Sequence, residues 1–191
     1  MAKFFTRKEF AEAADFIRSR TDHEPTIGLI LGTGLNPLAE EVRRADAISY
    51  REIPHFPVST IEGHVGRLVI GELEGQEILV MQGRAHHYEG YSPQHIVLPV
   101  RVMQLLGIEI LIVTNAAGGL NPAFKAGDLM LTTDHINLIG MAGLNPLHGP
   151  NDPQLGPRFV DMSQAYDLKL REMALRVAKS LGFPLHQGVY I

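Results

Sequence analysis

Apolar positions spaced three or four residues apart predict two amphipathic helices, one near each end of the chain. In TRKEFAEAADFIRSR, Thr6 and Glu9 have the spacing of a capping box. The apolar residues after them share one face: Phe10, Ala13, Ala14 and Ile17. In YDLKLREMALRVAKSLGFP, the apolar face consists of Leu170, Ala174, Val177 and Leu181. We expect this second helix to stop at Gly182 and Pro184.

Short apolar runs between these helices predict strands. They are TIGLIL at 26–31, the two halves of GRLVIGELEGQEILVMQ at 66–82, IEILIV at 108–113, GDLMLTTDHINL at 127–138 and the opening of LHQGVYI at 185–191. The turn residues Glu74 and Gly75 join the two halves of 66–82 as a hairpin.

A third helix is predicted for SPQHIVLPVRVMQLLG, with Ser92 as N-cap and Gly107 as the stop. Pro99 inside this pattern predicts a kink. The stretch at 146–159 is rich in proline and glycine, which indicates a long irregular loop. Because strands alternate with helices and no linker interrupts the chain, we expect one α/β domain over residues 1–191, built on a central sheet.

The composition excludes several classes of protein. Seventeen Lys and Arg against 21 Asp and Glu give a net charge of −4, which argues against broad, non-specific nucleic-acid binding. Without cysteine, the chain has no disulfides, thiolate catalysis or cysteine-based zinc sites. Its nine histidines lack the spacing of metal ligands, so no metal is expected. No apolar run suits a signal peptide or a membrane span, and a cytoplasmic protein is the default expectation.

The last residues carry an expectation of their own. The sequence stops inside the apolar run at 185–191, and a domain seldom ends in the middle of a strand. We therefore expect a fragment that is truncated at its C-terminus and leaves sheet edges unpaired.

Three strand ends lead into unusual loops, and ligands of α/β proteins gather at strand ends. The loops are LGTGLNP at 31–37, QGRAHHYEGYSP at 82–93 and TNAAGGLNP at 114–122. Their glycines let backbone approach a ligand closely, and successive backbone N–H groups can cradle an anion. Pro37 stands where a dinucleotide fingerprint needs glycine, and the Walker Gly-Lys-Ser/Thr motif is missing.

The loop at 82–93 has the most specific chemistry. Arg84 offers a planar fork of donors suited to phosphate, and His86 can donate beside it. A solvated loop with an ion pair between Arg84 and Glu89 is the plainer alternative. The hydroxyl of Thr33 and the amide of Asn115 can likewise serve neighbouring backbone groups. The three loops together favour an oxyanion-binding enzyme over a plain scaffold.

Five stretches, in chain order, resemble the purine nucleoside phosphorylases of the homotrimeric type. They are GLILGTGL, IPHFPVSTIEGHVGRL, GRAHHYEGYS, VTNAAGGLNPAFKAGDLMLTTDHINL and RFVDMSQAYD. The resemblance implies a pentosyltransferase of purine salvage, which cleaves purine nucleosides such as inosine and guanosine with inorganic phosphate. It also implies a mixed, partly barrel-like central sheet flanked by helices, a homotrimer, and no cofactor or metal.

The resemblance assigns roles to individual residues. Phosphate would be bound by Thr33, His64, Arg84, His86 and the backbone of Ala116. His86 and Glu89 would be catalytic, with Glu89 orienting His86 or the anion. The nucleoside would contact Tyr88, Asn115, Ala116, Ala117 and Gly118. Phe159 would reach into the site of a neighbouring subunit.

Two alternatives remain open on sequence alone: a methylthioadenosine phosphorylase and a non-catalytic phosphate-binding fragment. The family's base-binding residues lie in its last third, beyond Ile191, so purine preference is undetermined here. For the same reason we expect residues 1–191 in isolation to be inactive.

Overall fold

The computed structural model describes residues 4–59 and 65–191 of the chain. They form two compact units, which are described separately. The first takes the described residues within Met1–Ala116 together with Pro146–Leu155, and the second comprises Ala117–Asn145 and Gly156–Ile191. The expectation that residues 1–191 form one domain stays a prediction. Of the predicted site residues, His64 lies outside the part of the chain that the structure describes.

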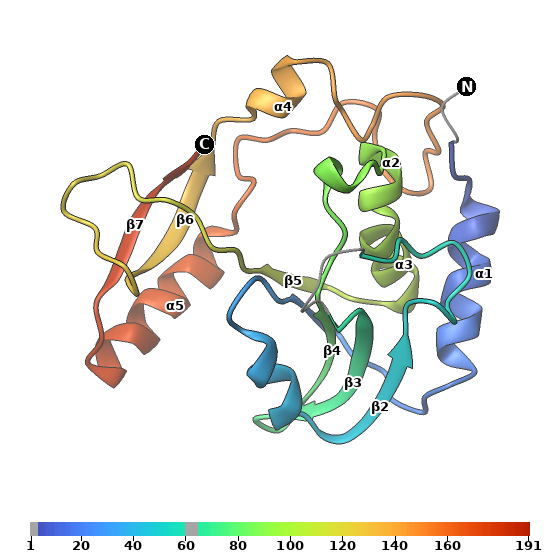
Figure 1. The fold of residues 1–191 in the computed structure, drawn as a ribbon, viewed down its shortest axis with the longest axis horizontal. Helices are drawn as coiled ribbons and strands as arrows, with labels where there is room; N and C mark the ends of the chain where they lie inside the picture. Colours follow the sequence, from blue (N-terminus) through green and yellow to red (C-terminus); the bar gives the residue numbers. More distant parts are fainter. Residues whose placement is uncertain (1–3, 60–64) are drawn as a thin grey trace. The chain divides into compact units, whose positions relative to one another are not determined.

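The first unit is built on a five-stranded sheet in the order β2-β3-β4-β1-β5 (Figure 1). Its strands are β1 (Ile27–Ile30), β2 (Arg43–Ser49), β3 (Arg67–Leu73), β4 (Gln76–Gln82) and β5 (Ile110–Val113). Strand β1 runs parallel to both β4 and β5, whereas β2, β3 and β4 pair antiparallel. The expected α/β class with a mixed central sheet is confirmed, and the described strands close no barrel.

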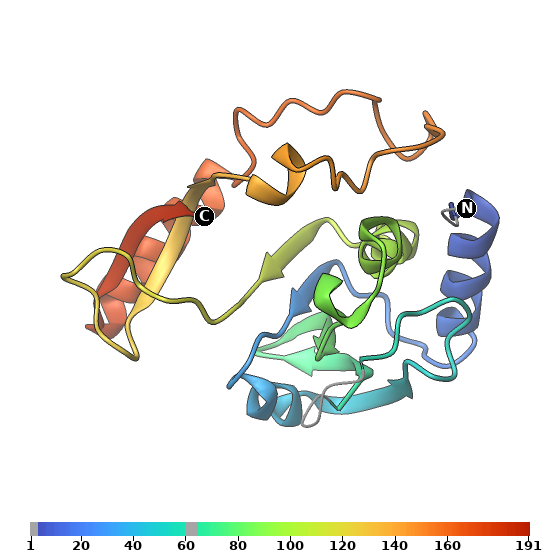
Figure 2. The same cartoon turned by 45° about the horizontal axis from the view of Figure 1, so that its top comes forward.

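Alternation along the central strands separates two apolar layers, because successive side chains of a strand point to opposite faces. One layer includes Ile30, Leu79 and Met81 and is covered by α1 (Arg7–Arg18) and α3 (Leu98–Leu106). The other includes Leu29 and Val80 and packs under the short 3₁₀ helix η1 (Asn36–Glu41). Figure 2 shows η1 and α3 on opposite sides of this sheet.

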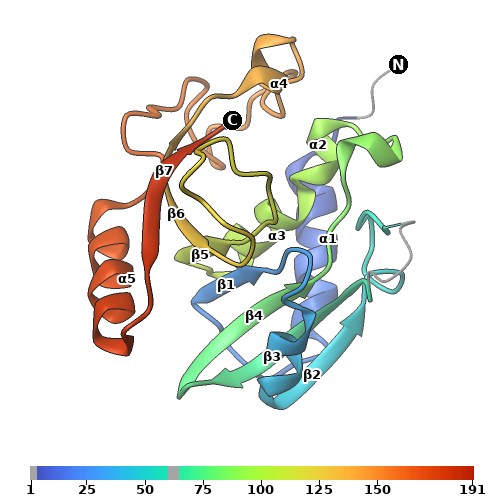
Figure 3. The same cartoon turned by 60° about the vertical axis from the view of Figure 1, so that its left-hand side comes forward.

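Helix α1 forms as its sequence predicts. The side chain of Thr6 accepts a hydrogen bond from the backbone of the first turn, and Glu9 accepts one in return from the backbone N–H of Thr6. The hydrogen bonds from Thr6 lower the pKa of Glu9. The predicted apolar face is the buried one: Phe10, Ala13, Ala14 and Ile17. This face packs toward α3 and the sheet (Figure 3).

The hairpin of β3 and β4 is confirmed, with Glu74 at φ 50° and Gly75 at φ 74° in its turn. The N-cap at Ser92 and the stop at Gly107 are confirmed, but the kink expected at Pro99 is a break at Val97, where two helices, α2 (Pro93–Ile96) and α3, meet. The reason is that Pro99 occupies the first turn of α3, where its missing N–H is not needed, so it starts a helix instead of bending one.

The second unit contains β6 (Leu129–His135), α4 (Leu138–Met141), α5 (Leu168–Leu181) and β7 (Leu185–Tyr190). Strands β6 and β7 pair in parallel, and α5 lies beside them (Figure 1). Asp167 caps α5 by accepting from the backbone N–H of Leu170, and Gly182 ends the helix at φ 73°. The predicted helix and both predicted strands are confirmed. No helix of the described residues is long and apolar enough to cross a bilayer.

Candidate functional site

Thr114, the first residue after β5, joins the ends of β1 and β5. Its backbone N–H donates to the carbonyl oxygen of Ile30 at 3.0 Å, and its hydroxyl donates to the same oxygen at 3.1 Å. That hydroxyl oxygen accepts from the backbone N–H of Gly32 at 2.9 Å. One side chain therefore uses both its donor and its acceptor to hold the first loop against the third.

Gly32 lies so close to this junction that no side chain fits there. A Cβ atom on Gly32 would lie 2.6 Å from the carbonyl oxygen of Thr114 and 2.7 Å from the Cα atom of Asn115. Both distances are shorter than any real contact of a Cβ atom. The glycine is thus required by the close approach of two backbones, and this contact holds the loop that carries Thr33 near the end of β5.

Arg84 reaches the same junction from β4. Its chain turns at Gly83, which has a φ of 93°. The Nη1 atom of Arg84 donates to the carbonyl oxygen of Thr114 at 2.6 Å. Because β1 lies between β4 and β5 in the sheet, this guanidinium spans the end of β1 and arrives two residues before Ala116. Three loops that are distant in sequence therefore meet around Thr114.

A short 3₁₀ turn, η2 (His87–Glu89), folds the carboxylate of Glu89 back onto His86. One carboxylate oxygen lies 2.7 Å from the backbone nitrogen of His86 and 3.1 Å from its Nδ1 atom. The other accepts from the hydroxyl of Ser59 at 3.0 Å. The Glu89 side chain is only 2% exposed, which makes it a fixed acceptor that holds the proton of His86 on Nδ1.

Tyr88 and Asn115 have simple surroundings. The ring of Tyr88 stacks on that of His86, with centroids 5.0 Å apart and planes inclined by 13°. The other face of Tyr88 is open, since the residue is 75% exposed. The side-chain amide of Asn115 donates to the neighbouring carbonyl of Ala116 at 3.4 Å. This contact fits the local backbone role that the sequence left open for Asn115.

The remaining predicted residues are not brought to this junction by the contacts described. Ala117, Gly118 and Phe159 belong to the second unit, where Phe159 is 90% exposed. An added Cβ atom at Gly118 would meet nothing within 4 Å, so packing does not require glycine there. Among the described residues, no group of three or more His, Asp or Glu side chains is arranged to hold a metal ion.

Sequence reasoning did not single out Thr114. The available signal is a hydroxyl residue placed directly after the strongest apolar run, where the strand ends. Threonine there resembles an ordinary strand-end residue, because the partners of its hydroxyl lie 82 and 84 positions away in the chain.

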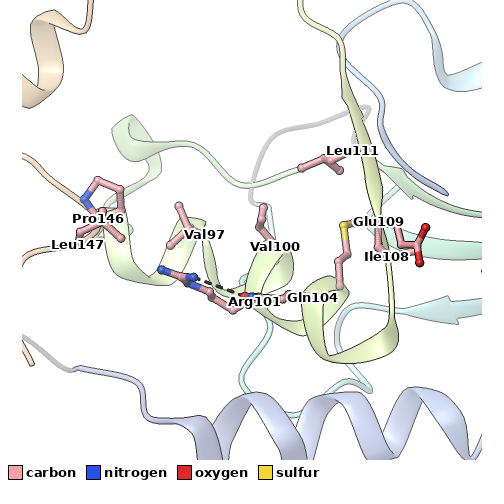
Figure 4. Close-up of a pocket in the computed structure, with 10 residues that line it drawn as sticks. Val97, Val100, Arg101, Gln104, Ile108, Glu109, Leu111, Pro146 and Leu147 are labelled. Atoms are coloured by element: carbon pink, nitrogen blue, oxygen red, sulfur yellow. Dashed lines mark hydrogen bonds between the residues drawn. The ribbon is translucent and has the colours of Figure 1, made fainter. Parts of the chain in front are cut away.

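A separate hollow of about 320 Å³ lies in the first unit (Figure 4). Val100 and Arg101 of α3 line it together with Val97, Leu111 and Pro146. Its lining is mostly apolar and contains none of the predicted phosphate residues that the structure describes. It is therefore distinct from the junction at Thr114.

Comparisons with known proteins identify related chains. A model of the Phosphorylase superfamily matches residues 26–191. Purine nucleoside phosphorylase 1 of Geobacillus stearothermophilus is 54% identical over 185 residues, which are 97% of this chain and 66% of that protein. Purine nucleoside phosphorylase 1 of Bacillus subtilis strain 168 is 55% identical over 178 residues, which are 93% of this chain and 65% of that protein.

Solved structures are similar as well. Isoform 2 of purine nucleoside phosphorylase from Schistosoma mansoni, in complex with cytosine and ribose-1-phosphate, has a TM-score of 0.93 at 46% identity, covering 98% of this chain and 67% of that one. Purine nucleoside phosphorylase from the same organism in complex with inosine has a TM-score of 0.90 at 46% identity, covering 96% of this chain and 65% of that one. The chain thus spans about two thirds of the length of the relatives it matches.

Proposed function

The chain belongs to the phosphorylase superfamily, and we propose that it acts in the phosphorolysis of purine nucleosides such as inosine and guanosine. The products would be the free purine and ribose 1-phosphate, or the corresponding deoxyribose products. The observation that supports this most directly is the junction at Thr114, where Arg84 meets the end of β5. The relatives named above are called purine nucleoside phosphorylases, which favours this function over methylthioadenosine phosphorylase.

In this proposal the phosphate binds at the loops around Thr114. Arg84 offers a guanidinium and Thr33 a hydroxyl as hydrogen-bond donors. The backbone N–H of Ala116, two residues after Thr114, is a third donor in this proposal. His86 completes the group, together with His64, which is outside the described residues. An anion held by several fixed donors loses little entropy when it reacts, because the enzyme has already oriented it.

The chemistry then requires no protein nucleophile. A phosphate oxygen forms a bond to the anomeric carbon of the sugar while the bond from that carbon to the purine nitrogen breaks. The electron pair leaves with the purine, which takes up a proton. Positive charge develops on the sugar, as in glycoside hydrolysis, and the bound phosphate stabilises it electrostatically. Since phosphate is itself the nucleophile, we propose that no cofactor or metal takes part.

Glu89 has a supporting part in this scheme. Its buried carboxylate accepts from the Nδ1–H of His86, so the lone pair of Nε2 can accept a hydrogen bond from a protonated oxygen of the bound phosphate. The ring of Tyr88, stacked on His86 and exposed on its other face, is suited to pack against ribose.

Phe159 is the proposed contribution of one subunit to the next. It is 90% exposed, so its ring is available for contact with a partner. We infer that it packs on the nucleoside bound by a second copy of this chain, within a homotrimer. Under this arrangement activity would depend on assembly.

Two measurements test the proposed function. The first is calorimetric titration of residues 1–191 with inorganic phosphate, for which saturable binding is expected. The second uses a chimera in which this chain is joined to the portion of the Bacillus subtilis relative that its alignment leaves unmatched. The chimera should release hypoxanthine from inosine only when phosphate is present. A folded chimera that releases no hypoxanthine, or releases it equally well without phosphate, would overturn the proposal, and so would absence of phosphate binding.

A further inference from the structure

Gln82, the last residue of β4, stands out among the described residues as a polar residue buried in the sheet, at 2% exposure. Ile78 and Val80 precede it on the same face of the strand, and both belong to the apolar layer under η1. An apolar residue at position 82 would continue that layer. A buried amide costs free energy unless each of its polar groups finds a partner.

The amide of Gln82 is fully engaged by two neighbouring segments. Its Oε1 atom accepts from the Nε atom of Arg67 at 2.6 Å. Its Nε2 atom donates at 3.1 Å to both the carbonyl oxygen of Asn36 and the Oε1 atom of Glu40. Arg67 closes the ring by donating from Nη2 to the same oxygen of Glu40 at 2.7 Å. We call Gln82, Arg67 and Glu40 the brace.

Each end of the brace adjoins a loop of the proposed phosphate site. Gln82 lies two residues before Arg84. Asn36 and Glu40 belong to η1, which begins directly after the glycine turn that carries Thr33. Arg67 is the first residue of β3, which pairs with β4. The brace thus connects the segments that must keep a common geometry if they share one anion.

A second contact fixes the backbone between Gln82 and Arg84. The hydroxyl of Tyr50 donates to the carbonyl oxygen of Gly83 at 2.8 Å, in a buried position. Burial raises the pKa of Tyr50 well above its ordinary value of 10.0, so this hydroxyl keeps its proton. The peptide that leads into Arg84 is therefore held from both sides, by Gln82 and by Tyr50.

We propose that the brace positions the loops of Thr33 and Arg84 for phosphate, so that Gln82, Arg67 and Glu40 are positioning residues of the anion site. The inference rests on the proposed function. Its physical basis is that a satisfied hydrogen-bond network admits one arrangement of its partners, whereas an apolar contact tolerates small shifts. A shift of a few tenths of an ångström in either loop would misalign the donors that converge on the anion.

The test compares Gln82→Met with Gln76→Met. Methionine has about the length of glutamine and no hydrogen-bonding amide, and Gln76 is an exposed residue at the other end of the same strand. Phosphate affinity is measured calorimetrically on folded protein, well below the melting temperature of each variant. Gln82→Met should bind phosphate about tenfold more weakly, by analogy with the loss of hydrogen-bond partners behind metal ligands. Gln76→Met should match the wild type.

A second pair of variants avoids the buried position, in case Gln82→Met fails to fold. The Glu40 side chain is 62% exposed, so its replacement has little effect on folding. Glu40→Leu removes the shared acceptor and should weaken phosphate binding about threefold, whereas Glu40→Gln keeps an acceptor oxygen and should largely restore it. A purely structural role predicts a lower melting temperature without this difference in affinity.

The outcomes separate the two proposals. If the wild type does not bind phosphate, the proposed function fails and the inference fails with it. If the wild type binds phosphate and both Gln82→Met and Glu40→Leu bind it equally well, only the positioning role of the brace is overturned.

Discussion

The substitution Gly32→Ala adds one methyl group where the backbone after β1 closely approaches the backbone after β5. Its Cβ atom would lie 2.6 Å from the carbonyl oxygen of Thr114, and an ordinary contact begins at 3.4 Å. The two backbones must therefore separate by about 0.8 Å. That carbonyl oxygen also accepts from Arg84, so the same movement displaces the guanidinium or breaks its hydrogen bond.

The loss of stability expected from Gly32→Ala can be compared with that from Gly71→Ala in β3. A Cβ atom there would meet the carbonyl oxygen of Arg43, also at 2.6 Å, and the Cα atom of Ala45 at 3.0 Å. Overpacking of this kind costs about 1–3 kcal/mol of the free energy of unfolding. For a chain of this size, about 2 kcal/mol corresponds to a decrease in melting temperature of roughly 4–8 °C. Both variants should show such a decrease.

The two variants should differ in phosphate binding. Gly71 lies away from the Thr114 junction, so Gly71→Ala is expected to bind phosphate as tightly as the wild type. Gly32→Ala should bind it at least about tenfold more weakly, because a displaced donor contributes little to a converging site. The assay is thermal unfolding with and without phosphate, together with calorimetric titration. Equal phosphate affinity in Gly32→Ala and the wild type would refute the assignment of the site to this junction.

Three further predictions follow from individual contacts. Arg84→Ala should weaken phosphate binding in titration while leaving the fold, measured by circular dichroism, largely intact. The hydrogen bond to Glu77 and one to a backbone carbonyl raise the pKa of His23 above 6.5, because both ring nitrogens face acceptors. This contribution to stability is complete below pH 6.5 and is lost as the pH rises through the raised pKa, so His23→Gln should flatten that part of the stability profile. Tyr50→Phe leaves the carbonyl of Gly83 without its hydroxyl donor and should lower the free energy of unfolding, measured in urea, by about 1–3 kcal/mol.

Each of these predictions has a control. Arg43→Ala removes an exposed arginine of β2 and should not change phosphate affinity; an equal loss would indicate a general charge effect. Glu77→Gln should flatten the pH profile as His23→Gln does, since it removes the same ion pair. A wild-type stability that stays constant above pH 6.5 would contradict the role of His23. If Tyr50→Phe has the same midpoint of urea unfolding as the wild type, the predicted contribution of the buried hydrogen bond to stability is wrong.

Local sequence was sufficient for the elements whose signals lie within one or two turns of chain. Thr6 and Glu9 cap α1, and Glu74 and Gly75 form the hairpin turn, because all their partners are close in sequence. The α/β class with a central sheet was also predictable, from apolar runs of strand length separated by helices, and its mixed character was implied by the family resemblance. The break at Val97 was not, because a proline inside a helical pattern can either bend one helix or begin another.

The features of the candidate site also separate into those that could be expected from the sequence and those that could not. Glu89 and His86 lie three positions apart, and their contact was implied by the family resemblance, whereas residue types alone suggested an ion pair between Glu89 and Arg84. The side-chain chemistry of Arg84 and Thr33 is enough to indicate an anion, because a guanidinium and a hydroxyl are both donors suited to phosphate. Their roles in phosphate binding, like those of the nucleoside-binding residues and Phe159, stay predictions.

Thr114 and Gln82 became visible only in the tertiary structure. The sheet order β4-β1-β5 brings Thr114 to Gly32 across 82 positions of sequence, and η1 meets Gln82 across 42 or more. Apolar periodicity states which face of a strand is buried but not which strand lies beside it. Pairing between distant strands is selected by the packing of the whole sheet, and contacts that depend on it carry no local signature.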